Sequence, residues 1–153
     1  MVIRHANRDD RAEWHRMRCA LWPDDAAVHD TEIDEYLLGK WVTSIVFVAE
    51  RLDGSGLCGF VEARLRDHAE GCTSSPVAYL EGWYVDSEYR RTGVGAALLS
   101  AFEQWGVANG ATEAASDTEV ENRLSRAAHG ALGFEEVEDV TLFRKNLNPS
   151  LDW

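Results

Sequence analysis

The stretch that decides the fold is VDSEYRRTGVGAALL, residues 85–99. An apolar strand runs into a basic, glycine-containing turn, and the turn opens directly into an amphipathic helix. The first turn of a helix has unpaired N–H groups and a positive dipole end, so it attracts anions. Gly93 and Gly95 let the backbone approach a phosphate closely, and Arg90 and Arg91 add positive charge. The stretch therefore predicts a pyrophosphate site between a strand and a helix.

Two better-known phosphate loops are excluded. The stretch has no G-K-[S/T] ending, so it is not a P-loop, and Leu98 replaces the third glycine of a dinucleotide fingerprint. The remaining alternative is a glycine-containing helix start that binds nothing. The paired arginines, the strand before them and the helix after them argue against that alternative.

The hydrophobic pattern on either side of this stretch predicts an α/β (α+β) domain with a mixed central sheet flanked by helices. The expected element order is β-α-α-β-β-β-α-β-α-β-β. Strands are expected at residues 2–6, 44–51, 57–65, 77–85, 113–116, 136–138 and 141–145. Helices are expected from Asp9 to Pro23 and at about 29–40, 93–109 and 121–132. We expect one domain over residues 1–147 and a C-terminal tail over 148–153.

Composition narrows the possible partners. The chain has 153 residues and a formal net charge of −12, which argues against nucleic acid and anionic membrane surfaces and favours a cationic ligand. An acidic surface that only keeps the protein soluble is the simpler alternative. Three widely spaced cysteines without a C-x-x-C pair predict reduced thiols and no metal site. With no apolar run long enough for a membrane span and no secretory signal, we expect a cytoplasmic protein.

The basic turn resembles a known family motif. Residues 90–95, RRTGVG, match the [RQ]-x-x-G-x-[GA] loop of GCN5-related N-acetyltransferases, the GNAT superfamily. The opening strand at Ile3–Ala6 and the sequence Leu132-Gly133-Phe134 extend the resemblance over nearly the whole chain. The resemblance implies a GNAT-type fold, acetyl-CoA as the acetyl donor and coenzyme A as the product.

The same resemblance implies the cofactor contacts. Backbone groups of Trp83 and Val85 would pair with the pantetheine arm like an added strand. N–H groups from Arg91 through Ala96 would hold the pyrophosphate, and the Asn122 side chain would contact the arm. Asn122 could instead be a solvated residue in the first turn of a helix. The full expected set is Trp83, Tyr84, Val85, Arg90, Arg91, Thr92, Gly93, Val94, Gly95, Ala96 and Asn122.

One branch of the superfamily is the most similar. Short blocks at Leu21–Asp24, Ser75–Val77, Leu80–Val85, Ala115–Asp117 and His129–Phe134 resemble aminoglycoside 6'-N-acetyltransferases. The resemblance implies an aminoglycoside 6'-amine as acceptor, antibiotic resistance as a consequence, and a homodimer. Acceptor sites diverge quickly on a common fold, so the resemblance to this branch is weaker evidence than the match to the superfamily.

A polycationic acceptor needs rigid carboxylates and an apolar wall for the sugar faces. By resemblance, Trp22 would form the wall, while Glu81, Asp117 and Glu138 would supply the negative lining. His68 stands where relatives place an aromatic contact. The alternatives are a core position for Trp22, a helix cap for Asp117 and a solvated surface for Glu138. Glu81 interrupts an otherwise apolar strand, where a buried carboxylate would need a partner.

The catalytic candidates are Glu81, Asp117 and His129. Glu81, directly or through a water, would accept a proton from the acceptor ammonium, and the neutral amine would attack the thioester without an acyl-enzyme. The N–H of Trp83 would stabilise the developing oxyanion. His129 would protonate the departing thiolate. Solvent could do this instead, and His129 could only pack at a helix end.

Two rival functions stay open from the sequence. The first is an acetyltransferase of the same superfamily that acts on a polyamine, a small amine metabolite or a protein N-terminus. The second is an acyl-CoA-binding sensor without turnover. Glu81 and Asp117 favour an enzyme over the sensor.

Overall fold

The computed structural model describes residues 1–147, which fall into two compact units. The first unit is Met1–Thr118, and the second begins at Glu119. The predicted tail, residues 148–153, lies outside the described residues. None of the helices described for residues 1–147 is long and apolar enough to cross a membrane.

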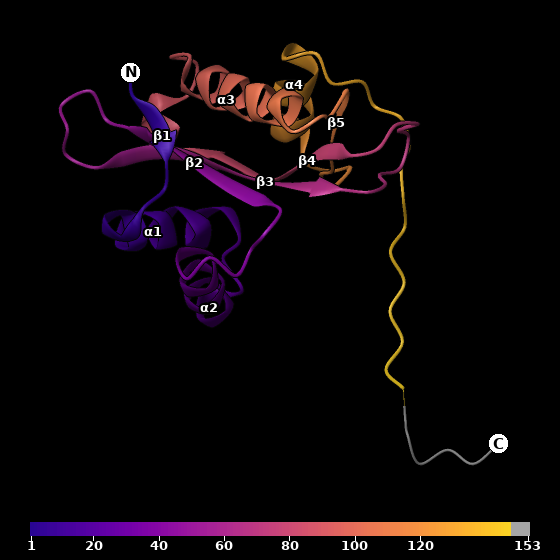
Figure 1. Ribbon diagram of the computed structural model, residues 1–153, viewed down its shortest axis with the longest axis horizontal. Coiled ribbons are helices and arrows are strands. Elements are labelled where there is room, and N and C mark those ends of the chain that lie inside the picture. The colour runs from indigo at the N-terminus through magenta and orange to yellow at the C-terminus, as the bar shows by residue number, and fades with distance from the viewer. Residues whose placement is uncertain (148–153) are drawn as a thin grey trace. The chain divides into compact units, whose positions relative to one another are not determined.

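The first unit is built on a mixed sheet, which confirms the predicted fold class (Figure 1). The sheet has the order β1-β2-β3-β4-β5; the first four strands are antiparallel neighbours, and β5 is parallel to β4. The strands are β1 (Ile3–His5), β2 (Ser44–Glu50), β3 (Leu57–Arg66), β4 (Val77–Val85) and β5 (Glu113–Ser116). The β4 and β5 bounds are those predicted from the sequence.

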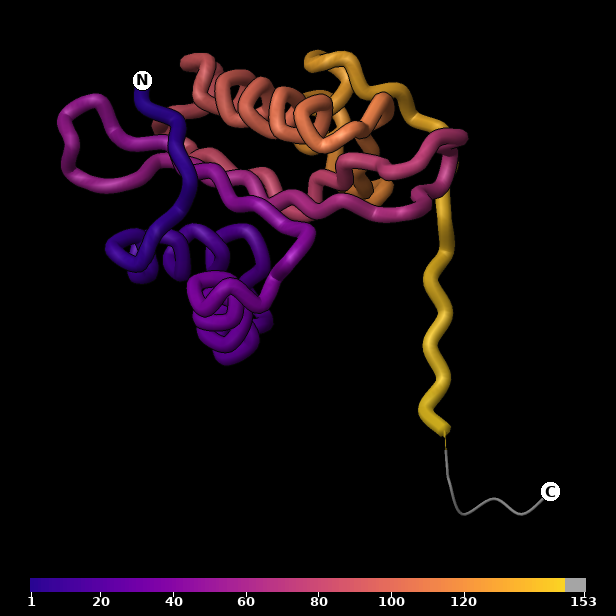
Figure 2. The backbone as a smooth tube through the Cα atoms, in the orientation of Figure 1, coloured from indigo at the N-terminus to yellow at the C-terminus, as the bar shows by residue number. Residues whose placement is uncertain are grey.

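Helices cover both faces of this sheet. α1 (Arg11–Leu21) and α2 (Ala26–Leu37) lie on one face, and α3 (Val94–Ala108) lies on the other (Figures 1 and 2). Two short 3-10 turns, η1 (Arg8–Asp10) and η2 (Ser87–Tyr89), precede α1 and α3. α2 begins three residues before the predicted start at His29.

Each face has its own apolar packing. Trp14 and Met17 on α1 are fully buried and pack with Ile33 of α2 against Phe60 of β3. On α3, Val94, Leu98 and Phe102 recur at helical spacing and are buried. Burial of the α1 and α2 side chains holds both helices on the sheet. The end of α1 and the first half of α2 border a pocket.

β4 departs from a regular strand at Glu81. Glu62 of β3 is opposite Gly82, and Ala63 is opposite Leu80, so Glu81 is the extra residue of a β-bulge. Such a bulge turns a side chain away from the regular alternation of the strand. β5 pairs only with Val77–Leu80, so the second half of β4 has β3 on one edge and no strand of the described residues on the other.

The second unit corrects one prediction. α4 (Arg123–Ala131) forms as expected, but residues 136–138 and 141–145 have no regular secondary structure. Their apolar side chains, Val137, Leu142 and Phe143, are exposed. A strand needs a neighbour to pair with its N–H and C=O groups, and a local sequence pattern alone does not supply one.

Candidate active site

A pocket of about 710 Å³ lies among α1, α2, the segment before β2, and strands β3 and β4. Its lining includes four carboxylate side chains, Asp25, Glu32, Glu62 and Glu81, and three basic ones, Arg18, Lys40 and Arg64. Trp22 and Trp41 supply the aromatic part of the wall. Two of the predicted acceptor residues, Trp22 and Glu81, thus meet in one cavity.

The Trp22 ring lies directly on the backbone of β4 at Gly82. A Cβ at Gly82 would come within 2.6 Å of the ring carbon Cη2, so only glycine leaves room for this packing. Phe60 and His29 lie next to the same ring, with centroids 6.4 and 6.0 Å away. Trp22 therefore packs partly against the core and also forms part of the pocket wall. The sequence had left these two positions open as alternatives.

A buried cation lies under the pocket. Arg18, only 3% exposed, has its Nε 2.7 Å from Oε1 of Glu62 and an Nη2 2.5 Å from Oε2 of Glu32. Glu62 accepts hydrogen bonds from Nη2 of Arg18 at 3.2 Å and from the indole N–H of Trp14 at 2.9 Å. Burial raises the pKa of Glu62, while Arg18 and Trp14 favour its ionised form.

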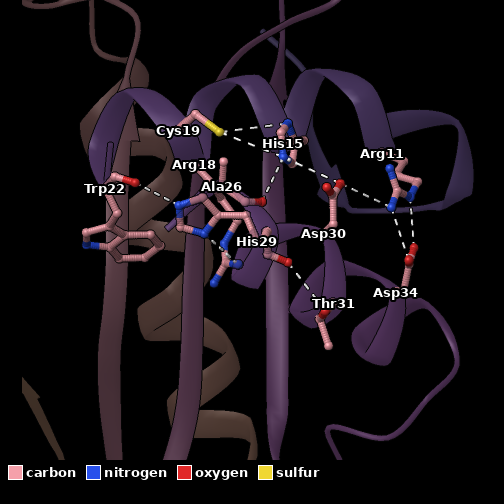
Figure 3. A network of polar contacts seen from close by, with 11 residues as sticks. Arg11, His15, Arg18, Cys19, Trp22, Ala26, His29, Asp30, Thr31 and Asp34 are labelled. Carbon is pink, nitrogen blue, oxygen red and sulfur yellow. Dashed lines mark hydrogen bonds and ion pairs between the residues drawn. The ribbon is translucent and has the colours of Figure 1, made fainter. Parts of the chain in front are cut away.

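The same cation fixes His29. The Nε2 of His29 donates to the Trp22 carbonyl at 2.7 Å, while Nδ1 lies 3.2 Å from an Nη of Arg18 (Figure 3). Because arginine only donates, Nδ1 must accept, and the proton belongs on Nε2. Arg18 and His29 together hold the end of α1 where Trp22 begins to line the pocket.

Glu81 is exposed rather than buried, which corrects the expectation of a carboxylate enclosed in an apolar strand. The bulge explains the difference, because it turns this side chain to the surface. Arg66 donates to both carboxylate oxygens, at 2.8 and 3.0 Å, and Arg64 lies 3.2 Å away. The carboxylate does have partners, and they are arginines of the neighbouring strand.

Asp117 follows β5 and accepts a hydrogen bond of 2.5 Å from the hydroxyl of Tyr79. The predicted alternative, a helix cap, is not its role, because Asn122 caps α4 through its own side chain, 3.0 Å from the N–H of Ser125. Burial and the Asp117 hydrogen bond raise the pKa of Tyr79, so the phenol keeps its proton and remains the donor.

The open half of β4 has backbone groups directed outward. The N–H of Asp86 donates to Cys58 of β3 at 2.8 Å. Because peptide groups alternate sides along a strand, the N–H and C=O groups of Trp83 and Val85 point to the edge without a strand. The side chain of Arg90 reaches that edge and donates to the Val85 carbonyl at 3.1 Å.

The loop after β4 has the features of an anion site. Gly93 begins α3 with φ +92°, a conformation that glycine adopts without strain, and Arg91 also has a positive φ of 60°. The first helical bond runs from the N–H of Ala97, so the N–H groups of residues 94–96 precede the ladder. Neither Arg90 nor Arg91 forms an ion pair with a carboxylate of the described residues. Thr92 donates to the Tyr89 carbonyl and closes the turn.

Asp86 anchors the start of this loop. Arg16 of α1 donates to both of its oxygens, at 2.9 and 3.1 Å. Burial alone would raise the pKa of Asp86, but the hydrogen bonds and charge of Arg16 outweigh burial and hold the pKa below its usual range.

Among the predicted residues of the first unit, His68 does not line the pocket. His68 is 75% exposed and lies 3.8 Å from Glu70, away from the pocket lining. Asn122, His129 and Glu138 belong to the second unit. There His129 donates from Nδ1 to the Ser125 carbonyl at 2.7 Å, and Glu138 is exposed. Their roles stay predictions.

Sequence reasoning missed the cations of the site, Arg18, Arg64 and Arg66. One signal was present: Glu62 interrupts an apolar strand just as Glu81 does, and a buried carboxylate calls for a buried cation. The position of Arg18 among Trp14, Met17 and Leu21 on α1 could have supplied that cation. In the described part of the chain, no group of three or more His, Cys, Asp or Glu could hold a metal ion.

Residues 12–134 match the Acetyltransferase (GNAT) family. The chain belongs to this family. An aminoglycoside N(6')-acetyltransferase type 1 of Klebsiella aerogenes is 47% identical over 148 residues, which cover 95% of this acetyltransferase and 97% of the relative. A protein with the same name from Stenotrophomonas maltophilia is 45% identical over 97% of this chain and 95% of its own.

Solved structures agree with this placement. AAC(6')-Iy in complex with the bisubstrate analogue CoA-S-monomethyl-acetylneamine has a TM-score of 0.87 and 38% identity, with 95% of this chain and 98% of that chain covered. Apo AAC(6')-IG from Acinetobacter haemolyticus has a TM-score of 0.89 and 34% identity, with coverage of 97% and 100%.

The Asp86–Arg16 pair predicts a pH-dependent stability. Asp86→Asn should lower the free energy of unfolding at pH 7 by about 1–2 kcal/mol, near the low end because Arg16 is partly exposed. A lowered folded-state pKa stabilises the protein fully above about pH 4, and this contribution is lost as the pH falls through the folded value. Urea unfolding between pH 3 and 7 should therefore show the two proteins converging at low pH. The exposed Asp67→Asn is the control, and a difference independent of pH would contradict the assignment.

Proposed function

We propose that this acetyltransferase moves an acetyl group from acetyl-CoA to the 6'-amine of aminoglycosides. The observation that carries the proposal is the position of Glu81. Its side chain lines a carboxylate-containing pocket whose wall includes Trp22. The part of β4 that follows Glu81 is the part that β5 does not pair with. An acceptor amine in the pocket would thus lie beside a donor laid along that edge. The names of the relatives support the same acceptor.

The residues of the first unit fit acetyl-CoA. The outward backbone groups of Trp83 and Val85 suit the amides of the pantetheine arm, and the N–H groups at the start of α3 suit a pyrophosphate. Arg90 and Arg91 would add charge-assisted hydrogen bonds to phosphate. Gly95 has no side chain, and a Cβ there would lie 3.4 Å from the Trp83 ring. Acetyl-CoA supplies an acetyl thioester that an uncharged amine can attack.

The acceptor amine must lose a proton before it can attack, and Glu81 is the group we assign to take it. Glu81 can accept the proton directly or through a water, since its exposed side chain reaches the pocket. Asp117, held by Tyr79, would bind a second ammonium group. The N–H of Trp83 would stabilise the oxyanion, and His129 would return a proton to the leaving thiolate.

The broader assignments are proposals too. We place the enzyme in the cytoplasm, since Cys19, Cys58 and Cys72 are all free thiols. We treat residues 1–147 as one catalytic domain followed by a tail, and we assign a homodimer. The exposed apolar side chains between Val137 and Phe143 support the dimer, because a second copy could pair with this segment and cover them.

Light scattering of the full chain should give twice the single-chain mass, and a single-chain mass would contradict the dimer.

The reaction and its position are tested with a matched pair of acceptors. Neomycin B carries a 6'-amine, and paromomycin carries a 6'-hydroxyl in its place. Thiol release from acetyl-CoA should be rapid with neomycin B and absent with paromomycin, because only the amine at that position is acetylated. Equal thiol release with both acceptors would show that an amine other than the 6'-amine is acetylated. Release with neither, despite acetyl-CoA binding, would contradict the aminoglycoside proposal and favour the polyamine, peptide or sensor alternatives.

The role of Glu81 is tested by Glu81→Gln. Loss of the proton acceptor should lower kcat at least about 100-fold near neutral pH and remove the acidic limb of the pH profile. The matched control is Glu103→Gln on the exposed face of α3, which should keep both. An unchanged kcat and pH profile in Glu81→Gln would mean that positioning and solvent carry the proton transfer.

A further inference from the structure

Glu81 already has a cationic partner inside the protein. Both oxygens accept hydrogen bonds from one nitrogen of Arg66, at 2.8 and 3.0 Å, and Oε1 lies 3.2 Å from its Nε. The two ion-pair partners are about equally exposed, with 31% of each side chain accessible. Arg64 lies 3.2 Å from Oε1 as well, so an ammonium group that binds Glu81 has to enter a site that two guanidinium groups already border.

Arg66 is held there by more than charge. Its guanidinium carbon lies 3.4 Å from the centroid of the Tyr79 ring, and Tyr79 is buried. A guanidinium over an aromatic face gains a cation–π interaction, which is strongest where water is excluded. The stacked, forked group loses less freedom on pairing than a lysine would, so this pair is more persistent than an isolated surface ion pair.

The same ring connects the two predicted acceptor carboxylates. The hydroxyl of Tyr79 donates to Asp117 on β5, while its face carries Arg66, which holds Glu81 on β4. Glu81, Arg66, Tyr79 and Asp117 therefore form one chain of contacts within the first unit. Displacement of Arg66 from Glu81 changes the partner of the carboxylate without removing the Tyr79–Asp117 bond.

We propose that Arg66 is a specificity-determining residue that acts as an internal competitor of the acceptor amine on Glu81. This inference rests on the proposed function. When a cationic acceptor binds Glu81, the guanidinium–carboxylate pair is lost and an ammonium–carboxylate pair forms in its place. The first contact of the acceptor therefore adds little affinity. Acceptors with further ammonium groups gain additional pairs with other carboxylates of the same pocket, such as Asp25. Arg66 thereby selects polycationic acceptors over single amines.

The test measures acceptor affinity in Arg66→Gln. Titration calorimetry with neomycin B, in the presence of saturating coenzyme A, should show an affinity about three- to tenfold tighter than in the unaltered enzyme. The acceptor KM should fall by a similar factor without a rise in kcat, and the KM for acetyl-CoA should not change. Arg66→Lys keeps the charge and should retain most of the competition.

Two controls separate competition from other effects. Arg11→Gln removes the same charge from a surface pair with Asp34, outside the pocket, and should leave the affinity unchanged (Figure 3). In a Glu81→Gln background, Arg66→Gln should give no gain, because the contested carboxylate is gone. Thermal unfolding of each variant checks that the fold is intact.

Every other outcome decides against the competitor role. Weaker neomycin B binding in Arg66→Gln would show that Arg66 positions Glu81 for the acceptor, and unchanged binding would show that the pair does not limit it. A gain that persists with Glu81→Gln would indicate a general charge effect. If the unaltered enzyme neither binds nor acetylates neomycin B, the proposed function fails, whereas acetylation without these effects overturns only the inference on Arg66.

Discussion

The limited pairing between β4 and β5 is the constraint on which the site depends. β5 covers only the first four residues of β4, and the bulge at Glu81 begins where that cover ends. The bulge turns the Glu81 carboxylate toward the pocket. Because β5 ends its pairing at Leu80, the N–H and C=O groups of Trp83 and Val85 face outward from the sheet. A fully paired, regular β4 would have neither feature. Gly82 adds to this arrangement, because the missing side chain lets Trp22 lie on the strand.

Features encoded by short sequence patterns were predictable. The apolar run Val77–Val85 and the short strand Glu113–Ser116 have the predicted bounds, because hydrophobic side chains and turn residues mark both ends locally. The turn with Gly93 leads into α3 as expected, since a left-handed conformation before a helix favours glycine. Trp22 lines the pocket because Pro23 ends the helix there.

Features that depend on partners distant in sequence were not predictable. A bulge is a mismatch between two strands, so the sequence of β4 alone could not show that Glu81 is exposed. The Arg18–Glu62 pair joins residues 44 positions apart, and each looks ordinary in its own segment. Residues 136–138 and 141–145 were predicted as strands, yet strand formation depends on a neighbour that their own sequence does not specify.

Net charge is a poor guide to how this site recognises a cation. The chain carries a net charge of −12, which attracts polycations from a distance. Around the pocket, however, Arg18 compensates Glu32 and Glu62, while Arg64 and Arg66 compensate Glu81. Long-range attraction therefore sets how fast a cation arrives, whereas binding depends on which internal pairs it can replace. A buried pair such as Arg18–Glu62 resists exchange because separation leaves an uncompensated buried charge, but the partly exposed pair at Glu81 can exchange with solvent-borne cations. Burial thus separates the carboxylates that hold the pocket wall in place, such as Glu62, from those that an acceptor can reach, such as Glu81.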